Sequence, residues 1–408
     1  MSRRSEPAVL ARESAAPWGG PAWRHVAPGY DPGTPTVESL LARIRMGGEP
    51  DDGGEPRFLP ALGRLLRSLD TEADLHAEGR RAAHAELAAA LRRQRQTIQL
   101  LRDRPEIARI DIRTPLFLTG LPGSGAALLH NALAEHPGLD APTLAELHDP
   151  ADGRASPRRR REALERAGAL ARDAAGATAG RGSGLLLGAA RAGGCHRLLG
   201  NAFHGMAATL PWHVPGYAAW LETTDMTEAY AFHRAQLQAV SWRIPVSRPV
   251  LRDSFHARYL PQLLRVYPDA KVIQVHRDPA DTVTACAGIA TALRSRTARR
   301  PPRVGQEWAD RIERHLVAAE RARSGLSQER VLDLRFEDLV ADPARQVRAV
   351  LAFAGVTPTP LLDRVVAAFV ARTARAARRS RPFQPAEFGL SRRELTGRFS
   401  LYRSRYKV

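Results

Sequence analysis

Lysine is almost missing from this 408-residue chain and occurs only at Lys271 and Lys407. Cysteine is equally sparse, because Cys195 and Cys286 are too few for a disulfide framework or a cysteine-based zinc site. We therefore expect a reducing compartment and no metal. No apolar run approaches the roughly 18 residues of a membrane helix, and the N-terminus carries no apolar signal segment. These absences predict a cytoplasmic protein without a membrane partner.

Arginine supplies almost all of the formal net charge of +18. Such an excess suits acidic ligands, which include nucleotides, sulfated or phosphorylated substrates and nucleic acid. It also fits a solvated, arginine-rich surface, and composition leaves both interpretations open. The chain has no zinc-finger, RNA-recognition or heptad pattern, and this argues against nucleic acid as the partner.

The chain divides into an irregular arm, a helical extension, an α/β core and a tail. Residues 1–57 are rich in proline, glycine and charge without helical periodicity. Residues 58–114 carry apolar residues at helical spacing, with a strongly amphipathic helix over 78–101. Within 115–355, short apolar strands alternate with helices, which predicts a mostly parallel sheet flanked by helices. A C-terminal helix and tail are expected over 356–408. The expected strands lie at 115–119, 249–251, 271–275 and 330–334.

A glycine-rich segment, Gly120 to Gly125 (GLPGSG), follows the first expected strand and opens a helix. Loop amides and a helix N-terminus then point at one spot, which is the geometry of an anion site. Ala126 and Ala127 stand where an ATP-binding loop has Lys and Ser or Thr, so we exclude a kinase or NTPase. The third glycine of a dinucleotide fingerprint is also missing. The segment predicts a P-loop-like phosphate site or, alternatively, a tight turn without a ligand.

The loop resembles "GLPR(S/T)GTT" of the bacterial branch of the sulfotransferase family that depends on 3'-phosphoadenosine-5'-phosphosulfate (PAPS). Arg252 stands where this branch has the lysine of "LKSP", and "YPDAKVIQVHRDP" is similar to the family's "yPdAkfv.thRdP". Downstream, "VLDLRFEDLVADP" is similar to "vryEDLv.dP", and "EFGLSRRELTGRF" to the C-terminal tail. The likeness runs from about Phe58 to Tyr406. It identifies residues 58–408 as a sulfotransferase-like domain with the P-loop-like sulfotransferase fold.

The resemblance implies transfer of a sulfuryl group from PAPS to a hydroxyl of a small molecule, without a metal. It places the donor's 5'-phosphate in the loop and its 3'-phosphate on Arg277 of "HRDP", because an arginine fork can meet a phosphate bidentately. Tail arginines Arg378, Arg379 and Arg381 would assist. The alternative for Arg277 is an ion pair with Asp278 or Asp281. The implied donor-binding positions are Pro122, Gly123, Ser124, Gly125, Ala126, Ala127, Arg277 and Arg381.

Several of these positions depart from the family's pattern. Gly123 replaces a Lys or Arg, Ala126 and Ala127 replace hydroxyl residues, Ala285 replaces Ser, and Asp253 adds a carboxylate beside the Arg252 position. Each lost charge-assisted contact is worth roughly 1.5 to 3 kcal/mol, or about 10- to 150-fold in affinity. The chain is therefore either a working sulfotransferase or a protein of that fold without PAPS use. The second would perform donor-independent acid/base chemistry, such as cyclisation or elimination in specialised metabolism, or serve as a non-catalytic partner.

Sulfuryl transfer needs a base for the acceptor's proton, which typically contributes about 10²- to 10⁴-fold in rate. His256 is one candidate, because it follows the Arg252 strand at the edge where parallel sheets bind ligands. Glu146 is the other, since "PTLAELHDP" resembles the family's "P..wE" segment. Arg252 would supply a catalytic cation. The alternatives are a hydrogen-bonded loop histidine at 256 and a helix-surface carboxylate at 146.

Overall fold

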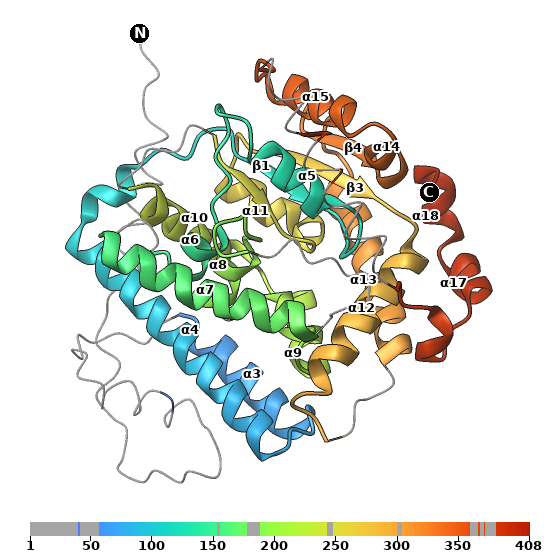
Figure 1. Ribbon diagram of the computed structural model, residues 1–408, viewed down its shortest axis with the longest axis horizontal. Helices are drawn as coiled ribbons and strands as arrows, with labels where there is room; N and C mark the ends of the chain where they lie inside the picture. The colour runs from blue at the N-terminus through green and yellow to red at the C-terminus, as the bar shows by residue number, and fades with distance from the viewer. Residues whose placement is uncertain are drawn as a thin grey trace.

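A computed structural model describes most of the chain. The described residues are 40, 57–152, 156–177, 188–242, 248–299, 304–359, 366, 367, 371 and 381–408. The expected arm over 1–57 therefore lies outside the described residues except for Leu40 and Arg57. Helices surround a small sheet on both faces (Figure 1). Among the described residues, no helix combines the length and the apolar character that a membrane span requires.

Four parallel strands form the sheet, in the order β2-β1-β3-β4. The strands are β1 (Leu116–Thr119), β2 (Val250–Arg252), β3 (Lys271–His276) and β4 (Val331–Arg335). Each lies within a residue or so of its expected position, and the predicted α/β class with a parallel sheet is confirmed. The strand order brings β2 beside β1 although residues 120–249 separate them, so the ends of these two strands meet at one sheet edge.

The N-terminal helical extension is a pair of helices, α3 (Leu59–Thr71) and α4 (Ala77–Asp103). The leucines of α3 recur on one face and are buried, as the amphipathic pattern predicts. His76 caps α4 by accepting the amide of Gly79 at 3.0 Å. The described ends of α4 agree with the helix expected over 78–101.

The other helices form the two layers and the tail. Several begin at residues that the sequence marks as starts: Asp278 caps α12 by accepting the amide of Ala280 at 2.9 Å, and Pro279 follows it. Their bounds are α5 (Ala126–Leu133), α6 (Leu144–His148), α7 (Pro157–Ala177), α8 (His196–Asn201), α9 (Pro215–Thr223), α10 (Thr227–Ser241), α11 (Leu260–Val266), α12 (Pro279–Arg294), α13 (Val304–Arg323), α14 (Phe336–Ala341), α15 (Pro343–Ala354), α17 (Arg392–Arg398) and α18 (Ser400–Tyr406), with 3-10 helices η1 (Pro105–Arg109), η2 (Met206–Thr209), η3 (His256–Tyr259) and η4 (Pro385–Phe388).

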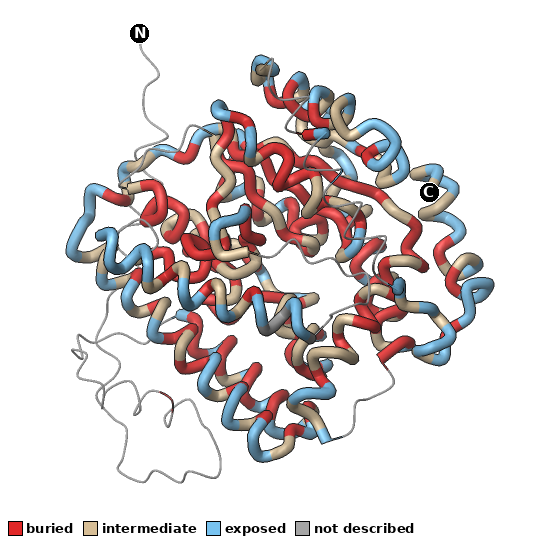
Figure 2. The backbone as a smooth tube through the Cα atoms, viewed as in Figure 1, coloured by how far each residue is buried: buried red, intermediate tan, exposed pale blue. Residues whose placement is uncertain are grey.

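Among the described residues, the core has two large clusters, one on each face of the sheet, and a small third cluster between α6 and α7. Side chains alternate along a strand, so Leu116 and Leu118 of β1 pack against α5 and α15, whereas Phe117 packs into the larger cluster under α3, α4, α10 and α12. Figure 2 shows the buried residues concentrated around the strands and on the inner faces of the helices. Because apolar side chains bury both faces of the sheet, polar side chains gather at the ends of the strands.

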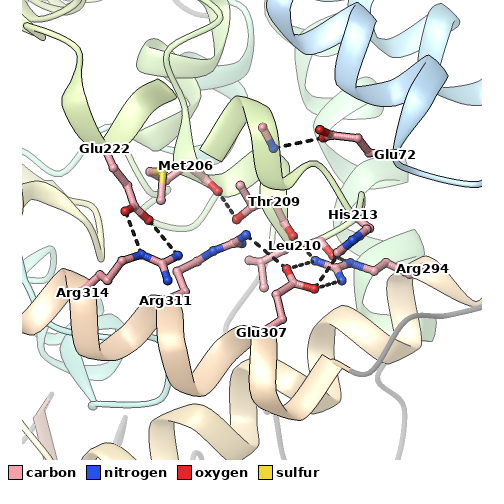
Figure 3. A network of polar contacts seen from close by, with 11 residues as sticks. Glu72, Met206, Thr209, Leu210, His213, Glu222, Arg294, Glu307, Arg311 and Arg314 are labelled. Atoms are coloured by element: carbon pink, nitrogen blue, oxygen red, sulfur yellow. Dashed lines mark hydrogen bonds and ion pairs between the residues drawn. The ribbon is translucent and has the colours of Figure 1, made fainter. Parts of the chain in front are cut away.

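A buried ionic network joins α12 to α13. The Glu307 carboxylate accepts two hydrogen bonds from Arg294, at 2.6 and 2.8 Å, and one from His213 at 2.9 Å, while Arg311 lies 3.1 Å away (Figure 3). Burial acts to raise the pKa of Glu307, but the hydrogen bonds from Arg294 and His213 outweigh it and hold the pKa at about 2. This network therefore holds α13 against α12, the helix that begins in the HRDP segment.

Candidate active site

The glycine-rich loop between β1 and α5 has a backbone that only glycine adopts easily. Gly120, Gly123 and Gly125 have φ values of 153°, 88° and 88°. A Cβ at Gly120 would lie 2.6 Å from Ser124 Oγ, and one at Gly125 would lie 2.8 Å from the Phe336 ring. The loop therefore folds tightly against itself and against α14, and it delivers the chain directly to the start of α5.

The loop offers unpaired donors where α5 begins. The first amides of a helix have no partner within it, and here those amides belong to the segment that starts at Gly125 and Ala126. Ser124 Oγ is buried and has no hydrogen-bond partner among the described residues. Oriented amides at a helix N-terminus with an unsatisfied hydroxyl beside them fit a phosphate group. The loop therefore has the backbone geometry of an anion site, and the 5'-phosphate site expected there stays a prediction.

Gly123 lies at the exposed tip of the loop, opposite Ala285 of α12. A Cβ at Gly123 would lie 3.5 Å from the Ala285 Cβ, so the position has space for a side chain. The positive φ nevertheless penalises every residue except glycine by about 1 to 2 kcal/mol. Introducing the family's cation at position 123 would therefore require a change of backbone conformation as well as a new side chain.

Arg277 fastens the loop to the start of α12. Its Nη1 donates to the Gly123 carbonyl at 2.6 Å, and its Nε and Nη2 donate to Asp281 at 3.2 and 3.0 Å. The guanidinium also lies over the Phe336 ring, 4.1 Å from its centre. The ion pair that the sequence left as an alternative is therefore present. Donor binding by Arg277 stays a prediction, in which its remaining donors face the phosphate beside the loop.

Two further arginines of the tail meet the same acidic pair. Arg392 contacts Asp281 and donates to Asp278 at 3.0 Å, and Arg403 lies 3.2 Å from Asp278. The sequence identified this tail motif, but the arginines assigned from it to donor binding lie upstream of the motif. Arg381 is exposed, and Arg378 and Arg379 lie outside the described residues. Arg392 belongs to the "SRRELTGRF" segment and lies on α17, whereas Arg403 lies beyond this segment on α18.

Arg252 ends β2 next to the glycine-rich loop, because Arg252 pairs with Leu118 in the β1–β2 register. Its Nε is buried and has no hydrogen-bond partner among the described residues. Burial lowers the pKa of Arg252, although the neighbouring Asp253 carboxylate opposes this. The structure therefore places a cation with an unsatisfied donor at the edge of the sheet where the loop begins.

Asp253 is a buried carboxylate beside that cation. The Phe255 amide donates to Asp253 Oδ1 at 3.3 Å. Burial raises the pKa of Asp253 to about 6, although this amide and the Arg252 charge oppose the rise. A carboxylate with such a pKa exchanges protons near neutral pH. Sequence reasoning noted Asp253 as a departure from the family but did not consider it as a base.

His256 and Glu146 lie inside hydrogen-bonded structure. His256 is fully buried; the Tyr230 hydroxyl lies 2.8 Å from Nδ1 and Cys195 Sγ 3.1 Å from Nε2. Burial, together with nearby His233, His196 and Arg252, holds the pKa of His256 well below its ordinary value. Glu146 forms a capping box on α6, where it accepts the Thr143 amide at 2.7 Å. Their roles as bases stay predictions, and the contacts match the structural alternative for each.

Comparisons with known proteins give the same fold. Sulfotransferase STF1 from Mycobacterium tuberculosis H37Rv is 24% identical with a TM-score of 0.76, and the match covers 90% of this chain and 99% of that one. Sulfotransferase STF9 from Mycobacterium avium is 19% identical with a TM-score of 0.79, and the match covers 93% of this chain and 99% of that one. A search of curated proteins gave no match. A family model described as the sulfotransferase family matches residues 115–360. The chain therefore belongs to the sulfotransferase family.

Proposed function

We propose that this protein transfers a sulfuryl group from PAPS to a hydroxyl of a small molecule. The observation that carries the proposal is the glycine-rich loop, in which the buried Ser124 Oγ has no hydrogen-bond partner among the described residues and α5 begins directly after Gly125. Arg252 at the end of β2 and Arg277 between β3 and α12 stand beside this loop. From the resemblance to PAPS-dependent sulfotransferases we infer that the anion belongs to an adenosine nucleotide with phosphates at the 5' and 3' positions.

Each residue has a distinct task in this proposal. When bound, PAPS supplies the sulfuryl group; the loop from Pro122 to Ala127 holds its 5'-phosphate, and Arg277 contacts its 3'-phosphate. Arg252 holds positive charge at the sheet edge where negative charge develops on the leaving oxygen. A fixed cation in a water-poor site stabilises that charge more in the transition state than in the ground state.

Asp253 is the group that we propose for the acceptor's proton. The acceptor oxygen bonds to sulfur as its proton moves to the carboxylate, and the bond between sulfur and the bridging phosphate oxygen breaks. A base works best when its pKa lies near the working pH, and the pKa of about 6 at Asp253 meets this condition. His256 and Glu146 remain the competing assignments.

A transfer assay tests the function. The purified chain is incubated with PAPS and a panel of phenols and aliphatic alcohols, and release of adenosine 3',5'-bisphosphate is followed by mass spectrometry. We expect slow transfer to at least one acceptor class, with a rate that falls as the pH drops below about 6 because Asp253 becomes protonated. Asp253→Asn should remove this pH dependence and lower the rate by about 10²-fold or more.

Glu146→Gln is the matched comparison, because glutamine retains the capping hydrogen bonds of α6 while it removes the carboxylate. Loss of transfer in Glu146→Gln with unchanged transfer in Asp253→Asn would assign the base to Glu146. Absence of transfer to every acceptor, in a folded protein that also fails to bind PAPS, would support donor-independent chemistry on the same fold.

A further inference from the structure

Three metal-ligating side chains meet in the core behind the β2 end. Cys195 precedes α8, His233 lies on α10 and His256 begins η3. One potential ligand atom from each lies within 4.8 Å of the others, and all three residues are buried. Sequence reasoning missed this set because the residues are far apart in the chain and the chain has only two cysteines. The proposed transfer, with Asp253 as its base, does not require them.

The two histidines are oriented by tyrosine hydroxyls. Tyr230 OH lies 2.8 Å from His256 Nδ1, and Tyr267 OH lies 2.8 Å from His233 Nδ1. Metal-binding histidines usually donate one ring N–H to such an outer partner, which leaves the other nitrogen for the ion. Here the remaining nitrogen of each ring is Nε2. Both imidazoles are therefore held in the arrangement of a ligand pair.

Hydrogen bonding alone does not satisfy the cluster. Cys195 Sγ lies 3.1 Å from His256 Nε2, so a thiol donating to this nitrogen would satisfy those two residues. His233 Nε2 is buried and has no hydrogen-bond partner among the described residues. Leaving one buried polar atom unsatisfied costs roughly 1 to 3 kcal/mol. A cation shared by all three residues would accept the Nε2 lone pair of each histidine and one lone pair of the thiolate sulfur.

We propose that Cys195, His233 and His256 bind a zinc ion. One thiolate and two imidazoles form a ligand set that zinc accepts, with a fourth position left for water. Zinc–sulfur and zinc–nitrogen bonds of ordinary length place tetrahedral ligand atoms about 3.4 to 3.6 Å apart. Ligand atoms within 4.8 Å of one another reach this spacing through small side-chain movements, without a change of fold.

A zinc ion would bind with release of one proton. Each imidazole would coordinate in its neutral form through Nε2. Zinc displaces the Cys195 thiol proton to solvent, which leaves a thiolate and a net charge of +1 at the site. Two residues of opposite charge, Asp253 and Arg252, interact electrostatically with Cys195, so their effects at the site partly cancel.

The ion would brace the chain segment that carries Arg252. The Cys195 amide donates to the Arg252 carbonyl at 2.8 Å, and His256 follows Arg252 by four residues. Zinc would therefore tie both sides of the β2 end to α10. We expect the ion to raise the melting temperature of the protein, and the proposed sulfuryl transfer does not depend on it.

Metal analysis of the tag-free, full-length chain tests the proposal. After expression with added zinc and dialysis against zinc-free buffer, we expect about one zinc per chain. The apo protein loaded with cobalt should show the near-ultraviolet charge-transfer band of a thiolate–cobalt bond. Cys195→Ala should abolish both signals, whereas Cys286→Ala should retain them, because Cys286 is a buried cysteine of α12 outside the cluster.

Two results would overturn the proposal: wild-type protein that holds neither zinc nor thiolate-bound cobalt, or equal loss of metal in the two cysteine variants. If Cys195→Ala fails to fold, His233→Ala takes its place, since it removes one ligand but leaves the contact between Cys195 and His256. Stoichiometric zinc in His233→Ala, with an unchanged cobalt spectrum, would likewise contradict the three-residue site.

Discussion

Arg277 occupies a position where two roles compete for one guanidinium. It donates to the Gly123 carbonyl and to Asp281, and the sequence resemblance also assigns it to the donor's 3'-phosphate. A charge-assisted hydrogen bond is worth roughly 1.5 to 3 kcal/mol. Arg277→Ala should therefore weaken binding of adenosine 3',5'-bisphosphate by at least about tenfold, as measured by calorimetry.

Asp281→Asn is the control for this variant, since it removes the same ion pair but leaves the cation in place. If Arg277 binds phosphate, Asp281→Asn should keep or increase the nucleotide affinity, because the guanidinium is freed from a competing anion. An account in which Arg277 only fastens the loop predicts that both variants lose stability and affinity together. That outcome would move the 3'-phosphate site to the tail arginines Arg392 and Arg403.

At the residue scale, sequence motifs located side chains better than they identified their partners. Arg252 and Arg277 stand at the sheet edge, where their motifs placed them. The surroundings of His256 were not predictable, since its partners Cys195 and Tyr230 come from segments 61 and 26 residues away. A local motif fixes the position of a residue along a strand, whereas burial and hydrogen bonding depend on which distant helices pack there.

At the scale of elements, the Glu307 network controls how α12 packs on α13. Removing one member of a buried ionic cluster leaves uncompensated charge, which typically costs about 3 to 5 kcal/mol. Glu307→Gln leaves the charges of Arg294 and Arg311 without this carboxylate, although their side chains are only 1% and 2% exposed. We expect denaturant unfolding at neutral pH to show a loss of stability of this size.

The same network gives wild type a specific acid dependence. Glu307 has its pKa lowered from 4.5 to about 2 in the folded protein. Its contribution to stability is therefore present above about pH 4.5 and disappears as the pH falls toward 2, a change of about 3 kcal/mol. Glu307→Gln should lack this component of the acid transition.

Glu162→Gln is the matched control on α7. Glu162 pairs with Arg158 on the helix surface, where the two side chains are 40% and 85% exposed. An exposed pair of this kind contributes at most about 0.5 kcal/mol. If Glu307→Gln destabilises the protein no more than Glu162→Gln does, the network does not stabilise the contact between α12 and α13.

At the scale of the whole molecule, the fold was predictable because its signals are local. Short apolar strands, the glycine-rich loop after β1 and the Asp-Pro start of α12 each mark their element in the sequence. The packing around β1 and β2 was not predictable, because the described helices between these two strands reach the sheet only through tertiary contacts. The same segment between β1 and β2 also supplies Cys195 and His233 of the proposed zinc site.

The central claim is that the loop binds the nucleotide of a sulfuryl donor despite the missing side chains at Gly123, Ala126 and Ala127. Calorimetric titration of the wild-type protein with adenosine 3',5'-bisphosphate, beside adenosine 5'-monophosphate, tests it most directly. We predict single-site binding of the bisphosphate that weakens as salt is added, with the monophosphate at least about tenfold weaker because it lacks the 3'-phosphate. Equal binding of the two nucleotides, or no binding of either by folded protein, would contradict this account.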